Sequence, residues 1–536
     1  MRNKILLIIL ALLSYAALYA QEEAWVYFVD KDNVLEALTN PLTILTQRAI
    51  DRKNRHNITI DSRDVPVNEN YIAQIKAISG ITVKAKSKWF NAVHVRGAQS
   101  DIENLDNLNF VSHVEFADRS LNQDKNATSR QYSKTGTVIT AFNYGNAANQ
   151  IEMLNGDELH LLNYTGEGMQ VAILDSGFPN VNTIGAFSRV RDAGHILGSY
   201  DFVNRDVDVY TNTTSRHGTL VFSDMAGFIQ DEFVGTAPDA SYYLFITEDA
   251  TSETPVEESY WVEAAERADS LGVDIINTSL GYSDFDGTKY DYTQADMNGQ
   301  TAFITKGANI AFEKGMLLVT SAGNSGNWGV TAPADSPNVL SIGAVDASGN
   351  YATFSSVGTT YQPSQKPDVV AQGQLSYVIT ENNVIGAANG TSFSAPILAG
   401  GITCLWQALP DKTNAEIMQL VRTSASQSDT PDNLLGHGIP DLELALDNAL
   451  SLTNISNTAE VFKVFPNPVK NELSISFPAE TDTCVLKVFN VLGKFTGEYK
   501  ISRQNPKIDV SSLSSGVYMI EISSGKATKY FKILKQ

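Results

Sequence analysis

Cysteine is nearly absent from this sequence: its 536 residues include only Cys404 and Cys484. Two thiols cannot form the disulfide framework of a small extracellular scaffold, so that class of fold is excluded, and the simplest interpretation is two separate buried thiols. Charged residues are also sparse, at 18%, whereas hydrophobic residues make up 43%. This composition is typical of globular domains, and it excludes a collagen-like or largely disordered chain.

Basic residues are too few to balance the acidic ones. Lysine and arginine together number 39, against 60 aspartates and glutamates, which gives a formal net charge of −21. The phosphates of nucleic acids and the headgroups of anionic membranes would repel such a chain. We therefore expect no nucleic-acid partner and no binding to an anionic membrane surface.

Long hydrophobic runs are missing after the first twenty residues. Arg2 and Lys4 precede an apolar run over 5–13, and Ala20 offers a small-residue cleavage point. This pattern predicts a secretory signal peptide over 1–20, and the run itself is too short to span a membrane. No later run reaches about 18 apolar residues, so we expect no membrane span after signal cleavage. Export combined with so little cysteine favours a bacterial protein.

A chain of this length has room for about three or four domains. Residues 21–125 combine short strands with helical spacing over 42–55 and 72–78, which favours a small α/β unit of ferredoxin-like split topology. Residues 126–150 are polar and show no periodicity, so we interpret them as a linker and processing region. In or beside it are three basic residues that favour cleavage there: Lys125, Arg130 and Lys134.

From 151 to 452, buried apolar strands alternate with helical stretches. Strands are expected at 171–174, 273–276 and 317–319, and helices at 260–271, 308–314 and 397–408. Repeated strand–helix units of this length predict an α/β fold with a doubly wound parallel sheet, covered by helices on both faces.

The last segment, 459–536, has a different pattern. Residues 473–477 and 518–522 alternate between apolar and polar side chains, and glycine and serine lie between such runs. Short alternating strands of this kind predict a small all-β sandwich. The charge changes as well, because 11 lysines and arginines here accompany only 7 acidic residues. We therefore expect a separate domain.

Four residues lie at expected strand ends or helix starts. Asp175 ends a strand before Ser-Gly, and His217 opens an expected helix next to Gly218. Asn324 follows another strand, and Ser392 lies among small residues at the start of an apolar helix. Parallel sheets gather their active groups at the carboxyl ends of strands, so these four side chains can meet.

Taken one at a time, each of the four residues has an ordinary structural interpretation. Asp175 and Asn324 fit turn residues. His217 fits a surface or helix-capping histidine, and Ser392 fits a helix N-cap. Together they form a complementary set: a nucleophile, its base, a carboxylate that orients the base and an amide that stabilises an oxyanion. The order Asp, His, Ser is that of subtilisin and differs from the order in α/β-hydrolases.

The chain resembles the subtilisin-like serine proteases, the subtilases, at three motifs. Residues 171–177 (VAILDSG) resemble their aspartate motif, 217–219 (HGT) their histidine motif and 390–396 (GTSFSAP) their serine motif. The resemblance covers about 165–445. The histidine motif departs from the family pattern after Thr219, which leaves the three motif residues intact and affects only local helix packing. The resemblance implies a subtilisin-like parallel sheet and a secreted serine endopeptidase.

The resemblance also implies a role for each site residue. Asp175, His217 and Ser392 would form the catalytic triad, and Asn324 would stabilise the oxyanion together with the backbone N–H of Ser392. Two segments would supply backbone edges that pair with an extended substrate. They are Ser279, Leu280 and Gly281, and Ser321, Ala322 and Gly323, with Tyr282 and Asp284 beside the first edge as candidates for shaping specificity.

The flanking segments resemble two further modules. Residues 22–120 resemble a subtilase propeptide, which implies that this part assists folding and inhibits the enzyme until it is cut. The motifs at 465–468 (FPNP), 491–494 (VLGK) and 513–518 (LSSGVY) resemble the C-terminal sorting domain of the type IX secretion system of Bacteroidetes. This resemblance implies the type IX machinery as a partner and a location at the cell surface or outside. The alternative for this segment is an ordinary carbohydrate- or protein-binding sandwich.

The expected substrates are proteins or peptides, and the chemistry requires no cofactor. Calcium is common in subtilases, but Asp201, Asp206 and Asp208 fit a solvated loop as well as a calcium site, so the metal content stays unknown. The alternative function is a non-catalytic surface binding protein on the same scaffold. Loss of a triad residue would favour that alternative, and none is lost.

Overall fold

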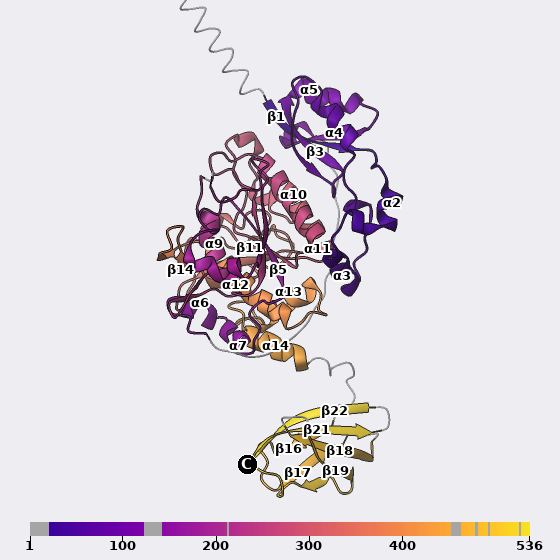
Figure 1. Ribbon diagram of the computed structural model, residues 1–536, viewed down its shortest axis with the longest axis vertical. Coiled ribbons are helices and arrows are strands. Elements are labelled where there is room, and N and C mark those ends of the chain that lie inside the picture. Colours follow the sequence, from indigo (N-terminus) through magenta and orange to yellow (C-terminus); the bar gives the residue numbers. More distant parts are fainter. Residues whose placement is uncertain are drawn as a thin grey trace, which may run out of the picture. The chain divides into compact units, whose positions relative to one another are not determined.

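The computed structural model describes residues 21–122, 142–211, 214–451, 462–477, 481–490, 494–524 and 527–536. The expected signal peptide lies outside these residues, and so does most of the expected linker. The chain divides into two compact units, Met1–Leu450 and Ser451–Gln536, which are described separately (Figure 1). The domain boundaries expected within the first unit stay predictions.

The first unit begins with a four-stranded antiparallel sheet in the order β2-β3-β1-β4. Its strands are β1 (Gln21–Phe28), β2 (Thr82–Ser87), β3 (Ala92–Ala98) and β4 (Val111–Phe116), and its helices are α2 (Val34–Thr39), α3 (Gln47–Arg55), α4 (Glu69–Lys76) and α5 (Gln99–Glu103). Val26 and Val93 of the sheet are fully buried in one core with Ile75 of α4. The expected small α/β unit is confirmed.

The helix expected over 42–55 begins later than its apolar spacing indicates. Pro41 opens a separate 3-10 turn, Pro41–Thr43, and Thr46 caps α3 by accepting a hydrogen bond from the N–H of Ala49 with its side chain. A proline is favoured at the start of a turn, and an N-cap hydroxyl fixes where a helix begins. Together these two residues divide the expected helix.

A seven-stranded parallel sheet forms the centre of the first unit, in the order β13-β12-β11-β10-β5-β9-β6. The strands are β5 (Gln170–Asp175), β6 (Ile196–Asp201), β9 (Ser241–Ile246), β10 (Ile275–Thr278), β11 (Leu317–Ser321), β12 (Leu340–Val345) and β13 (Val369–Gln372). β10, β11 and β12 are buried throughout, as is usual for strands of a parallel sheet covered on both faces. The strand β12 was not predicted from the sequence.

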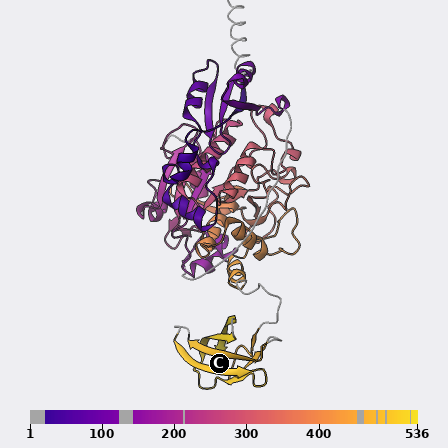
Figure 2. The same cartoon turned by 90° about the vertical axis from the view of Figure 1, so that its right-hand side faces the viewer.

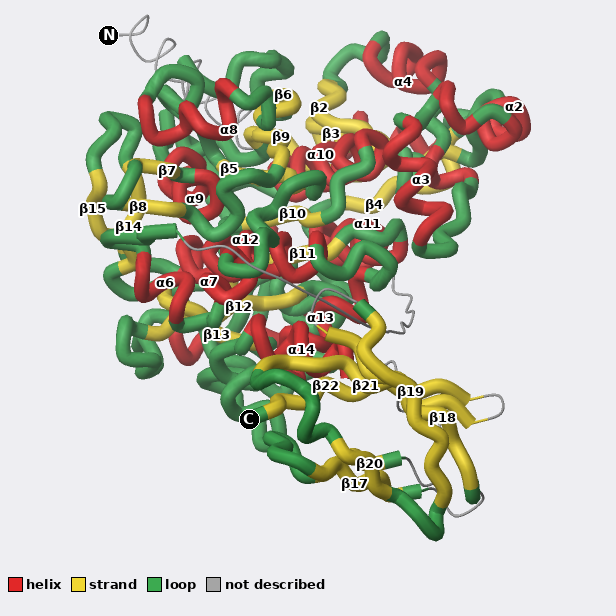
Figure 3. Tube along the Cα trace, turned by 60° about the horizontal axis from the view of Figure 1, so that its bottom comes forward, coloured by secondary structure: helices red, strands yellow, loops and turns green. Residues whose placement is uncertain are grey.

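Helices cover both faces of this sheet. In Figure 3, α9 (His217–Ala226) and α12 (Thr391–Gln407) lie on one side of the strands, and α10 (Val256–Leu271), α11 (Phe303–Glu313) and α13 (Asn414–Ser424) lie on the other. This confirms the doubly wound α/β class. The smaller elements are α6 (Ala148–Glu152), α7 (Gly156–His160), α8 (Ser188–Asp192), α14 (Leu442–Ser451), and the hairpins β7 (Phe228–Ile229) with β8 (Phe233–Val234) and β14 (Ser376–Ile379) with β15 (Ile385–Ala388).

The N-terminal sheet packs on α10 and α11, and both views show this N-terminal part against the rest of the first unit (Figure 1, Figure 2). Trp25 stacks on Phe303 with ring centroids 4.3 Å apart, and its Nε1 donates to the hydroxyl of Ser259 (2.8 Å). Glu266 of α10 accepts from the backbone N–H groups of Lys88 and Trp89, each at 2.9 Å. These contacts join the two parts of the first unit.

The second unit is a small all-β sandwich, as expected. One sheet has the order β16-β17-β20 and the other β19-β18-β21-β22. The strands are β16 (Lys463–Phe465), β17 (Glu472–Ser476), β18 (Thr483–Asn490), β19 (Phe495–Ser502), β20 (Lys507–Asp509), β21 (Gly516–Ser524) and β22 (Ala527–Lys535). Cys484 is buried in this unit and Cys404 in α12 of the first, both as free thiols. Among the described residues, no helix has the length and apolarity to cross a membrane.

Candidate active site

The carboxyl ends of three neighbouring strands form one edge of the parallel sheet. Asp175 is the last residue of β5, residues 279–281 follow β10, and residues 322–324 follow β11. The parallel register keeps β10 level with both of its neighbours. Side chains that are far apart in the sequence therefore come together at this edge.

Asp175 and His217 form a pair at this edge. His217 is the first residue of α9, and its Nδ1 atom lies 2.8 Å from Oδ1 of Asp175. The Asp175 side chain is fully buried, whereas 29% of the His217 side chain is exposed. The carboxylate can therefore fix the ring through one nitrogen while part of the ring stays accessible.

Gly218 explains how α9 can begin so close to the end of β5. A Cβ atom at this position would lie 2.5 Å from the carbonyl oxygen of Gly177 and 2.8 Å from the ring of Phe178. Only glycine leaves room for that approach. The glycine of the HGT motif thus positions His217 against Asp175.

The surroundings of His217 favour its protonated form. Burial acts to lower the pKa of the imidazole, but the charge of Asp175, the hydrogen bond to it and the charge of Glu248 outweigh burial and raise the pKa above its ordinary value. An imidazolium that forms here during a reaction is therefore stabilised.

Sequence reasoning missed Glu248. It lies two residues beyond β9, whose last residue, Ile246, pairs with Asp175 in the parallel register. Burial, together with the charges of Asp175 and Glu253, raises the pKa of Glu248 to about 8. The sequence shows only that Glu248 is an acidic residue just after an apolar run. Its position near Asp175 follows from the strand order, in which β9 lies next to β5.

Ser392 lies in the first turn of α12, at the same edge. Its hydroxyl donates to the carbonyl oxygen of Ser279 (3.1 Å), and the hydroxyl of Ser279 donates to the carbonyl oxygen of Ser392 (2.9 Å). The ring of the next residue, Phe393, lies 5.9 Å from that of His217 between centroids. Ser392 is thus adjacent in the chain to a residue whose ring packs near His217, and among the described residues no hydrogen bond joins Ser392 to His217.

The Asn324 side chain is held by the residue that precedes Ser392. Its Oδ1 atom accepts from the N–H of Thr391 (2.9 Å) and from the Thr391 hydroxyl (3.1 Å). Its Nδ2 group lies 3.7 Å from the place that a Cβ atom would take at Gly390, and it has no partner among the described residues. Thr391 was not singled out from the sequence, because its role depends on a contact across 67 positions.

The two expected substrate-binding segments differ in what their backbones offer. The N–H and carbonyl groups of Ala322 and Gly323 are all hydrogen bonded to other parts of the fold. Those of Leu280 and Gly281 have no partner among the described residues. The segment after β10 can therefore accept another strand, whereas Ala322 and Gly323 after β11 offer no free backbone groups.

The aspartates considered as a calcium site serve the local loop. Asp201 accepts from the N–H groups of Val203 and Asn204, each at 2.8 Å, and Asp208 accepts from the N–H of Tyr210 (2.8 Å). Across the described residues, no group of three or more His, Cys, Asp or Glu side chains is arranged to hold a metal ion.

Three family models match the chain. The Bacteroidota peptidase S8 propeptide domain matches residues 23–134, the subtilase family matches 166–438, and the secretion system C-terminal sorting domain matches 463–536.

Individual relatives are similar to this chain over about half of its length. Subtilisin NAT of Bacillus subtilis subsp. natto and subtilisin E of Bacillus subtilis strain 168 are each 30% identical over 285 residues. The match covers 52% of this chain and 65% of each relative, which is just under two thirds of their length. Among solved structures, MycP1 from Mycobacterium smegmatis is similar, with a TM-score of 0.44, 21% identity, and coverage of 59% of this chain and 89% of that one.

Proposed function

The chain belongs to the subtilase family, and we propose that it is a serine endopeptidase acting on proteins or peptides. The observation that carries this proposal is the Asp175–His217 pair, with 2.8 Å between Oδ1 and Nδ1, at the same sheet edge as Ser392. The family match and the paired side chains both support this proposal.

In the proposed mechanism, Ser392 attacks the carbonyl carbon of the scissile peptide bond. Its hydroxyl first turns from the carbonyl of Ser279 toward His217 by rotation about the Cα–Cβ bond. His217 takes the hydroxyl proton as the bond to carbon forms and later gives it to the leaving amine. Asp175 keeps the Nδ1 nitrogen protonated and stabilises the imidazolium.

The oxyanion of the tetrahedral intermediate is stabilised by Asn324 Nδ2 and the backbone N–H of Ser392. The two hydrogen bonds from Thr391 to Asn324 support this role, because they orient the amide before any substrate arrives. No cofactor is needed, since the nucleophile, the base and the oxyanion donors all belong to the chain.

An extended substrate pairs with the edge at Ser279, Leu280 and Gly281, where free backbone groups support strand addition. The segment Ser321, Ala322 and Gly323 forms a wall of the site, since its backbone is already bonded. Asp284 follows the first edge, is exposed, and is the residue proposed to shape side-chain preference. Tyr282, the other residue expected in this role, is buried, so any effect it has is through packing beneath the edge.

The rival function is a non-catalytic binding protein on the same scaffold. A fluorophosphonate probe distinguishes the two, because it reacts only with a serine whose hydroxyl is activated by a neighbouring base. We expect the matured protein to be labelled on Ser392, as read by mass spectrometry of the labelled peptide. An unlabelled but folded protein would support the rival.

The flanking matches support proposals for maturation and export. The N-terminal match supports inhibition by the chain's own propeptide until the linker is cut. The C-terminal match is to a secretion sorting domain, and the protein is secreted or displayed at the cell surface. The type IX secretion machinery is the proposed partner for that step.

Deletion of 459–536 should stop export without removing catalysis. The second unit has its own buried core, so the rest of the chain does not depend on it for packing. We expect the truncated protein to accumulate inside the outer membrane, and the extracted enzyme to hydrolyse casein. Cell fractionation measures the first result. Full-length Ser392→Ala is the control, which should still reach the exterior, and normal export of the truncated chain would instead favour a substrate-binding sandwich.

A further inference from the structure

The C-terminal end of α10 lies against α3 of the N-terminal part (Figure 1). α10 leads into β10 through Asp274, so this helix end is at the amino ends of the parallel strands. The candidate active site is at their carboxyl ends. The contact between α3 and α10 is therefore remote from Ser392 and can be altered without touching the residues proposed for catalysis.

Four consecutive carbonyl groups at this helix end, those of 270–273, accept hydrogen bonds from the α3 segment. The N–H and hydroxyl of Thr46 donate to the first two, at 2.9 and 3.0 Å. The guanidinium groups of Arg48 and Arg52 donate to the third and fourth. A helix leaves its last four carbonyls without partners within the helix. Here the N-terminal part supplies partners for the last two of α10 and for the two residues that follow the helix.

Each of these guanidinium groups also binds a carboxylate. Nη2 of Arg48 lies 2.6 Å from Asp274, and Nη2 of Arg52 lies 2.5 Å from Asp269. Lys53 reaches Asp269 as well, at 2.7 Å. Asp269 is fully buried, and its pKa shows how it depends on α3: burial alone would raise it, but the charges of Lys53 and Arg52 hold it below its ordinary value.

We propose that the end of α10 is a binding site for arginine side chains, separate from the substrate site, and that it retains the propeptide after the linker is cut. The site consists of the carbonyls of 270–273 and the carboxylates of Asp269 and Asp274. Its partner is a helix with a hydroxyl cap and arginines four residues apart, as in α3. This inference rests on the proposed function, in which maturation cuts the linker. After that cut the contact joins two separate fragments, so it becomes a binding equilibrium.

The two arginines should govern how long the fragment stays bound. Removal of Arg52 leaves the carbonyls of Val273, just beyond the negative end of the α10 dipole, and of Lys314 without this partner, and it leaves Asp269 with Lys53 alone. Truncating one partner of a buried, hydrogen-bonded charge pair acts mainly on the dissociation rate. The contacts of Trp25 with Phe303 and Ser259 remain in such a variant. The fragment therefore still binds, but its dissociation rate is higher.

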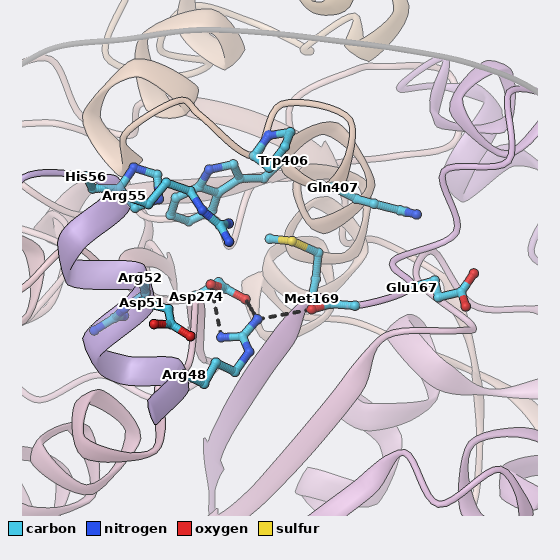
Figure 4. A pocket seen from close by; sticks show the side chains of 12 residues that line it. Arg48, Asp51, Arg52, Arg55, His56, Glu167, Met169, Asp274, Trp406 and Gln407 are labelled. Atoms are coloured by element: carbon cyan, nitrogen blue, oxygen red, sulfur yellow. Dashed lines mark hydrogen bonds and ion pairs between the residues drawn. The ribbon is translucent and has the colours of Figure 1, made fainter. Parts of the chain in front are cut away.

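The same helix offers a matched control. A cavity of about 350 Å³ lies beside α3, lined on its two sides by Arg55 and His56 and by Trp406 and Gln407 (Figure 4). Arg55 is exposed, and its guanidinium makes no hydrogen bond or ion pair among the described residues. Figure 4 shows Arg48 directed at Asp274, whereas Arg55 lies toward Trp406. Arg55→Ala therefore removes the same charge from α3 without emptying the proposed site.

The test uses the full chain with Ser392→Ala and a site for an unrelated sequence-specific protease placed within 123–141. The added protease makes the cut, so the measurement does not depend on the chain's own activity, and the released fragment is not degraded. The dissociation rate of the N-terminal fragment is then followed by size-exclusion chromatography after dilution. We expect Arg52→Ala to raise this rate by about 100-fold or more, Arg48→Ala by about 10-fold, and Arg55→Ala by less than about twofold.

Equal dissociation rates for the three variants would overturn the proposal. Retention would then depend on the packing of the N-terminal sheet on α10 and α11, or on the overall charge of α3. Should Arg52→Ala fail to fold, Arg48→Ala decides alone, since 31% of the Arg48 side chain is exposed and its loss spares the core. A wild-type protein without peptidase activity would contradict the proposed function and leave these rates unaffected.

Discussion

Ser392→Ala is expected to lower kcat by about six orders of magnitude while the fold stays intact. The variant loses the nucleophile, so no covalent intermediate forms. His217 then has no hydroxyl proton to accept, and the oxyanion donors have no tetrahedral intermediate to stabilise. The structural loss is small, because the hydroxyl makes one hydrogen bond, to the carbonyl of Ser279, worth about 1 kcal/mol. Hydrolysis of a chromogenic peptide measures kcat, and circular dichroism with thermal unfolding checks the fold.

Ser394→Ala is the matched control for this experiment. Ser394 lies in the same turn of α12, is fully buried, and donates its hydroxyl to the carbonyl of Thr391 (3.0 Å). Its loss should cost stability of about 1 kcal/mol but leave most of the activity. If the linker is cut by the chain itself, Ser392→Ala should also remain unprocessed. Wild-type activity in Ser392→Ala would show that the nucleophile is another residue.

Asn324→Ala should lower kcat by about 10²–10³ with little change in KM. The reason is that the negative charge on the oxygen exists only in the transition state, so a donor to it contributes nothing to substrate binding. Initial-rate kinetics over a range of substrate concentrations separate the two constants. A large rise in KM at unchanged kcat would make Asn324 a substrate-binding residue.

Asn324 also accepts two hydrogen bonds from Thr391, so the alanine variant removes two functions at once. Asn324→Asp separates them. An aspartate keeps the acceptor for Thr391 but lacks the N–H donor, and it adds a negative charge where one develops in the reaction. We expect it to be at least as impaired as Asn324→Ala. Recovery of activity in Asn324→Asp would mean that the anchoring of Thr391, and not donation to the oxyanion, is what matters.

The fold class could be predicted because buried parallel strands have a strong local signal. The run at 171–174 lies within β5, and the run at 317–319 lies within β11. The alternation of strands and helices along the chain was then enough to infer a parallel sheet. The run at 273–276 was placed two residues early relative to β10, Ile275–Thr278. Val273 is as apolar as the strand, so hydrophobicity alone cannot locate its start.

The roles predicted for Asp175, His217, Ser392 and Asn324 came from motifs that each occupy a few consecutive residues. What escaped prediction depends on contacts between distant segments. Glu248 lies beside Asp175 only because β9 is the neighbour of β5, and Thr391 matters only because Asn324 reaches it from another loop. The use of α3 to cap α10 escaped for the same reason. Arg48 and Arg52 stand in the printed sequence, but their partners at the end of α10 are more than 200 positions away.

The two cysteines lie one in each compact unit. Cys404 in α12 is fully buried and Cys484 in β18 is 5% exposed. A buried thiol reacts with a modifying reagent only when its surroundings open, so the labelling rate reports the free energy of that opening. The protein thus carries two natural probes of unfolding. In increasing urea, quantifying the labelled peptides separately would give one stability for the subtilase unit and another for the sorting unit, with no engineered label.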